Sequence, residues 1–139
     1  MVVVADRLLI VDTDLVIDFL RGAGPGADLV ETSLRDGAVR FTAVTAFELR
    51  LGADFFRRRQ QLDALLARRT LPLDGPAAII AGEIHTQLDR LGERIGVQEA
   101  LIAGVCRRFE LPLATRNVRH FRRVPGLRLI EVPDPAPHP

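Results

Sequence analysis

The stretch Leu8-Leu9-Ile10-Val11-Asp12-Thr13-Asp14 places two acidic residues directly after a short run of apolar ones. A continuous apolar run of this length is typical of a central parallel strand that is buried on both faces. The acidic residues then fall at the carboxyl-terminal edge of the sheet, where α/β proteins build their sites. We therefore predict that this edge carries the functional site.

Three further segments bring an oxygen-bearing side chain to a strand end or to the first turn of the next helix. They are residues 41–48, 96–103 and 113–117, and the side chains are Glu48, Glu99 and Asn117. Carboxylates that gather in one place repel one another, and a cation removes that repulsion. A set of oxygen ligands without Cys or His suits Mg²⁺ or Mn²⁺ rather than Zn²⁺. Such a site supports attack of activated water on a phosphodiester.

Composition limits the classes of protein that fit. The 139 residues correspond to about one domain, and 47% apolar residues are enough for a core without disulfides or a structural metal. The formal net charge is only +1, so no overall field attracts nucleic acid. The single Cys106 has no intramolecular partner and favours a reducing compartment. With no signal peptide and no apolar run near the ~20 residues that span a bilayer, we expect a soluble cytoplasmic protein with no membrane contact.

Strand-like and helix-like stretches alternate along the chain, which predicts a three-layer α/β/α sandwich around a mainly parallel sheet. We expect strands over residues 8–11, 39–43, 71–73, 111–114 and 127–132. We expect helices between residues 14 and 22, over 27–36, 45–53, 57–69, between 74 and 92, and over 98–109. Gly24-Pro25-Gly26 is predicted to be a turn. One domain should cover residues 1–132, followed by a disordered Pro-rich tail at 133–139.

Each candidate site residue also has a purely structural interpretation. Asp12 or Asp14 could cap the helix that follows, and Thr45 with Glu48 has the spacing of a capping box. Glu99 could be an acid in a first helical turn. Asn117 could be a turn residue. The functional interpretation depends on these side chains occurring together.

Taken together, these motifs resemble the PIN-domain nucleases, and among them the VapC-type toxin ribonucleases of bacterial toxin–antitoxin pairs. Residues 11–14, 17–21, 45–52, 99–104 and 113–121 match the family's conserved elements, among them Thr-x-x-Glu-Leu-x-x-Gly and Leu-Ala-Thr-Arg-Asn-x-x-x-Phe. The resemblance runs from Leu8 to Val132. It implies a metal-dependent endoribonuclease that cleaves RNA such as tRNA or rRNA, forms a homodimer, and is inhibited by a cognate antitoxin covering its active site.

The resemblance also assigns roles to individual residues. Asp12, Glu48 and Glu99 are expected to hold one or two Mg²⁺ or Mn²⁺ ions, with Asn117 as a neutral ligand or water-orienting partner. Thr13, Asp14 and Thr115 are expected beside them. We expect Arg21, Arg116 and Arg119 to bind RNA phosphates. Glu99 stands where most relatives carry Asp, and its extra methylene favours a water-mediated contact with the metal.

Other protein classes could also account for parts of this sequence. Asp12-Thr13-Asp14 after a strand is also similar to the start of haloacid dehalogenase-type phosphatases, but that mechanism generally uses a Lys, and this chain has none. The same absence excludes a Walker A nucleotide loop. A PIN scaffold that binds RNA or an antitoxin without cutting remains open, because Glu99 departs from the family pattern.

Overall fold

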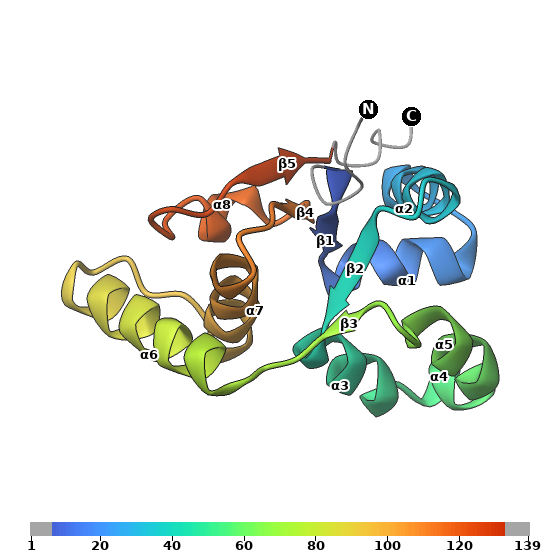
Figure 1. Cartoon of the computed structure of the whole chain (residues 1–139), viewed down its shortest axis with the longest axis horizontal. Coiled ribbons are helices and arrows are strands. Elements are labelled where there is room, and N and C mark those ends of the chain that lie inside the picture. Colours follow the sequence, from blue (N-terminus) through green and yellow to red (C-terminus); the bar gives the residue numbers. More distant parts are fainter. Residues whose placement is uncertain (1–6, 133–139) are drawn as a thin grey trace, which may run out of the picture.

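The structure, a computed structural model, describes residues 7–132 apart from the side chains of residues 53 and 54. Within this range five parallel strands form one sheet in the order β3-β2-β1-β4-β5. The strands are β1 (Leu9–Val11), β2 (Val39–Thr42), β3 (Thr70–Leu71), β4 (Leu113–Thr115) and β5 (Leu129–Glu131). Helices lie on both sides of the sheet (Figure 1), which confirms the predicted three-layer α/β/α sandwich.

The helices divide between the two faces of the sheet. Their bounds are α1 (Thr13–Arg21), α2 (Pro25–Arg35), α3 (Ala43–Leu51), α4 (Ala53–Phe56), α5 (Arg59–Leu66), α6 (Gly75–Arg90), α7 (Val97–Arg108) and α8 (Val118–Phe121). One core cluster joins the sheet to α1, α2 and α5. The other joins it to α6, α7 and α8, and α3 contributes Leu49 to the first cluster and Val44 to the second.

Strand β1 contributes to both cores at once. Leu9 and Val11 pack into the first cluster and Ile10 into the second, because successive side chains of a strand point to opposite faces. All three residues are buried. The continuous apolar run therefore marks the central strand, as predicted.

Several local predictions are wrong. Pro25 and Gly26 do not form a turn but begin α2, where proline fits because the first helical N–H has no partner within the helix. The predicted helix over residues 57–69 is shorter in the structure, where only α5 (Arg59–Leu66) forms, and the short helix α4 that precedes it was not predicted. The capping box at Thr45 is also absent, since α3 begins two residues earlier, at Ala43, and Thr42 is its N-cap, accepting a hydrogen bond from the N–H of Thr45 at 3.0 Å.

The remaining expectations concern the ends of the chain and its hydropathy. The predicted tail at 133–139 lies outside the described residues. Cys106 is fully buried on α7, and burial raises the pKa of its thiol far above the ordinary value. Among residues 7–132, no helix combines the length and the apolar character needed to cross a bilayer.

Candidate active site

Asp12 lies where β1 ends and α1 begins. Its backbone N–H donates to the carbonyl of Ala114 on β4 at 3.0 Å, which continues the pairing of the two central strands. As the N-cap of α1, it accepts the N–H of Thr13 at Oδ1 (2.8 Å). Its other oxygen, Oδ2, accepts the hydroxyl of Thr115 at 2.8 Å. Two strands and one helix thus hold this carboxylate, and Asp12 rather than Asp14 is the cap.

The environment of Asp12 disfavours its negative charge. Only 8% of the residue is exposed, and this burial raises the pKa of Asp12 to about 6. The hydrogen bonds from Thr115 and Thr13 lower the pKa, and the nearby charges of Asp14 and Glu48 raise it again. Near neutral pH the site therefore holds a buried carboxylate that gains from a nearby cation.

Glu48 reaches the same place from α3. Its Oε1 accepts the hydroxyl of Thr13 at 3.1 Å, and that hydroxyl also lies 2.8 Å from the hydroxyl of Thr45. Burial, followed by the charge of Asp14, raises the pKa of Glu48, while the Thr13 hydroxyl lowers it. Because α3 begins at Ala43, Glu48 is not used as a cap and turns toward the first turn of α1.

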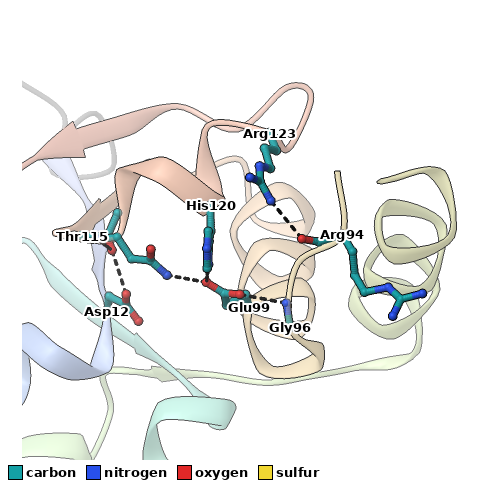
Figure 2. Close-up of polar contacts among 8 residues, drawn as sticks. Asp12, Arg94, Gly96, Glu99, Thr115, His120 and Arg123 are labelled. Carbon is teal, nitrogen blue, oxygen red and sulfur yellow. Dashed lines mark hydrogen bonds and ion pairs between the residues drawn. The ribbon is translucent and has the colours of Figure 1, made fainter. Parts of the chain in front are cut away.

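Glu99, on the first turn of α7, is held by three partners. Its Oε1 accepts the N–H of Gly96 at 2.8 Å, so it caps its own helix. Its Oε2 accepts the side-chain amide of Asn117 and lies 2.8 Å from Nδ1 of His120. Figure 2 shows His120 over Glu99, with Asp12 and Thr115 beside them.

Thr115 connects the two halves of the site. Its hydroxyl donates to Asp12 and accepts the backbone N–H of Asn117 at 2.9 Å. One half consists of Asp12 and Glu48, which both accept hydrogen bonds from Thr13. The other half consists of Glu99 with Asn117 and His120. Within the described part of the chain, no three or more His, Cys, Asp or Glu side chains are grouped to hold a metal ion.

The donors around Asp12 nevertheless fit a hard divalent cation. They are carboxylate and hydroxyl oxygens, which Mg²⁺ and Mn²⁺ prefer. Asp14 and Glu48 raise the pKa of Asp12 through their negative charges. A cation at this edge would relieve that repulsion.

The predicted RNA-binding arginines differ in their surroundings. Arg116 pairs with Asp18 of α1 at 2.7 Å, and both side chains are largely buried, so Arg116 ties α1 to the segment after β4. Arg21 and Arg119 are exposed. The contact of His120 with Glu99 was not predicted, although its position three residues after Asn117, one helical turn away, was a usable signal.

Comparison with known proteins identifies the family. The PIN domain profile matches residues 9–127. The chain is 32% identical to "Ribonuclease VapC10" of Mycobacterium tuberculosis over 82% of this chain and 86% of that protein. It is 30% identical to "tRNA(fMet)-specific endonuclease VapC" of Shigella flexneri over 84% of this chain and 92% of that protein.

Solved structures have the same fold. The crystal structure of FitAcB from Neisseria gonorrhoeae superposes with a TM-score of 0.75 at 25% identity, over 89% of this chain and 97% of that one. The DNA-bound VapBC structure from Salmonella typhimurium also gives a TM-score of 0.75, at 23% identity, over 89% and 97% of the two chains. The chain belongs to the PIN-domain family, and within it to the VapC ribonucleases.

Proposed function

We propose that this protein is the toxin of a type II toxin–antitoxin pair, an endoribonuclease that uses Mg²⁺ or Mn²⁺ to hydrolyse cellular RNA such as tRNA or rRNA. The observation that carries the proposal is Asp12, a buried carboxylate with a raised pKa at the end of the central strand. A relative named as a tRNA(fMet)-specific endonuclease supports the choice of substrate class. So does the all-oxygen character of the site, which suits phosphodiester hydrolysis.

We assign the metal to Asp12, Glu48 and Glu99, with Asn117 as a neutral ligand or water-orienting partner. When bound, the divalent cation supplies activated water and stabilises negative charge on the phosphate. Thr13 orients Glu48 through its hydroxyl, and Thr115 orients Asp12 in the same way. The exposed Asp14 adds negative potential at the edge.

The partners follow from the same family. Solved relatives include VapBC and FitAB assemblies, and we propose a cognate antitoxin that covers the carboxylate edge of this chain. We also propose that the protein acts as a homodimer. Arg21 and Arg119 are exposed and available to phosphates, whereas Arg116 contributes by holding α1 in place through Asp18.

The decisive experiment compares cleavage of a total tRNA pool by the parent chain and by Asp12→Ala, with Mg²⁺ or Mn²⁺ present. We expect the variant to cleave roughly 100-fold more slowly or worse, because loss of an outer-shell partner alone typically costs 10–100-fold. Asp28→Ala, at an exposed position on α2, is the matched control and should cleave like the parent. Equal cleavage by Asp12→Ala and the parent would reject the assignment.

One observation favours a second candidate, a PIN scaffold that binds RNA or the antitoxin without cutting. Both oxygens of Glu99 already have hydrogen-bond partners, which are Gly96 just before α7, and Asn117 and His120 after β4. If the parent chain retains tRNA but produces no new RNA ends with either metal, this candidate replaces the nuclease. Sequencing of RNA ends after brief expression distinguishes the two and identifies the target.

A further inference from the structure

Two hollows lie on the α4–α5 segment, and one of them also includes Arg21 at the end of α1. One, of about 440 Å³, is lined by Arg57, Arg58, Arg59, Gln60 and Gln61. The other, of about 250 Å³, is lined by Arg21, Phe55, Arg57 and Arg58. Since they share Arg57 and Arg58, we treat them as one feature, the arginine groove, lined by Arg21, Phe55, Arg57, Arg58, Arg59, Gln60 and Gln61. In Figure 1, α4 and α5 lie together below α1 on the right.

The groove lies in one of two strongly basic parts of a nearly neutral chain. Residues 50–69 contain six arginines and two aspartates, and residues 107–128 contain seven arginines and one glutamate, so the segments carry +4 and +6. The total is only +1, which leaves −9 for the other residues. Positive charge is therefore concentrated in these two segments, as is typical of a surface that binds polyanions.

The arginines of the second segment are largely used inside the fold. Arg108 pairs with Asp74, Arg116 with Asp18, and Arg123 and Arg128 donate to backbone carbonyls. These contacts hold helices and loops together. They leave fewer guanidinium groups for a ligand.

Two of the groove arginines also donate to backbone carbonyls, but Arg59 reaches only the carbonyl of Phe56, three residues before it, at 3.3 Å. Arg58 donates to the carbonyl of Leu20 near the end of α1 and so has a structural role. Arg21, Arg57 and Arg59 are exposed, and among the described side chains none of them pairs with a carboxylate. They are the arginines that a bound anion would meet.

An aromatic ring accompanies these charges. Phe56 is 68% exposed, and the guanidinium of Arg59 lies 4.6 Å from the centre of its ring. Arginines beside an exposed aromatic side chain form the kind of surface that binds single-stranded nucleic acid, through backbone phosphates and stacked bases. An acidic peptide would use the charges but would have no base to stack on the ring.

We propose that the arginine groove binds the phosphate backbone of an unpaired RNA segment, as an extension of the cleavage site. The inference rests on the proposed ribonuclease function. Asp12 and Arg21 lie at opposite ends of α1, whose nine residues span about 13 Å at 1.5 Å per residue. That length corresponds to roughly four nucleotides at about 3.4 Å per stacked step. One strand can therefore reach both the carboxylate edge and the groove.

The test measures binding without cleavage. A fluorescent 12-nucleotide 2′-O-methyl RNA is titrated with the full chain in EDTA at 50–200 mM NaCl. Arg57→Gln combined with Arg59→Gln should weaken binding on the order of tenfold at the lowest salt. The plot of log K against log salt should become shallower, its slope decreasing in magnitude by about 1.4, since each lost single-strand phosphate contact contributes about 0.7. Arg57→Gln alone, which keeps the Arg59–Phe56 contact, should give half of that decrease in slope.

The matched control is Arg35→Gln combined with Arg90→Gln, which removes the same charge at exposed positions on α2 and α6. It should bind the probe within about twofold of the parent. Equal losses in both double variants, or no loss in either, would overturn the groove assignment. The assignment would also be overturned if Arg57→Gln combined with Arg59→Gln left RNA binding unchanged but abolished binding of an acidic peptide. Failure of the parent to cleave tRNA would instead reject the nuclease proposal, since probe binding does not require catalysis.

Discussion

At the scale of single residues, two threonine hydroxyls decide how the acidic side chains are held. Thr13 donates to Glu48, and Thr115 donates to Asp12. Among the described residues, every buried side-chain nitrogen or oxygen has a hydrogen-bond partner. The carboxylates are thus oriented before any ligand arrives, although the burial that orients Asp12 also opposes its ionisation.

This opposition predicts how stability depends on pH. Asp12 has an ordinary pKa of 3.8 and a folded-state pKa of about 6, so between these values the folded chain binds more protons than the unfolded one. Its contribution to stability is therefore favourable at low pH and is lost as pH rises from about 4 to about 6, by about 3 kcal/mol. Asp12→Asn lacks this loss, and in EDTA it should be the more stable form at pH 7 by up to about 3 kcal/mol.

Urea denaturation at pH 4 and pH 7 measures the effect as the difference between Asp12→Asn and the parent. Asp28→Asn, at an exposed position, is the control and should show no comparable change of this difference with pH. A parent chain that gains stability relative to Asp12→Asn between the two pH values would contradict the burial argument.

At the scale of elements, α7, the helix that carries Glu99, packs closely against α6. Gly104 on α7 faces α6, where a Cβ would lie 2.5 Å from the carbonyl oxygen of Ala77 and 2.7 Å from the Cβ of Ala81. No side chain fits at that distance. The absence of a side chain at Gly104 therefore sets how near α7 lies to α6.

Two alanine substitutions on this helix pair should have opposite effects. Gly104→Ala should lower the free energy of unfolding by about 1–3 kcal/mol, because the added methyl group overpacks the helix contact. Gly82→Ala, on the exposed side of α6 with no atom within 4 Å of its added Cβ, should raise it by up to about 1 kcal/mol through helix propensity. Chemical denaturation measures both. Stabilisation by Gly104→Ala would show that the two helices can separate without cost.

At the scale of the whole molecule, the parallel sheet brings β1 and β4 side by side although they are about a hundred residues apart. Carboxylates that are distant in the sequence then share one edge of the fold. A cation bound there must stabilise the folded chain, since the unfolded chain has no such site.

Metal binding should therefore be visible as thermal stabilisation without any RNA. Mn²⁺ at about 100 times its dissociation constant should add about 2.7 kcal/mol, which raises the Tm of a domain of this size by several degrees. Asp12→Ala should show little or no shift, and Asp28→Ala should shift like the parent. A parent Tm that does not respond to Mn²⁺ or Mg²⁺ would count against the proposed cofactor.

The sequence alone determined the strands, most helices and the edge of the sheet where the site lies. Apolar runs and helical spacing are local patterns, so Leu9–Val11 could be identified as a central strand from its own residues. The family elements also marked Asp12, Glu48, Glu99 and Asn117 as candidates. The spacing of Thr45 and Glu48 gave a wrong prediction. The helix begins two residues earlier, so Glu48 does not take part in a capping box.

Only the tertiary structure decided which of these side chains meet. Glu99 joins Asn117 and His120 because α7 and the segment after β4 lie side by side, and Arg116 meets Asp18 across 98 residues of chain. The groove formed by Arg21 with Arg57 and Arg58 arises in the same way. Such contacts depend on how helices pack against the sheet, and packing is a property of the assembled core that no short stretch of residues contains.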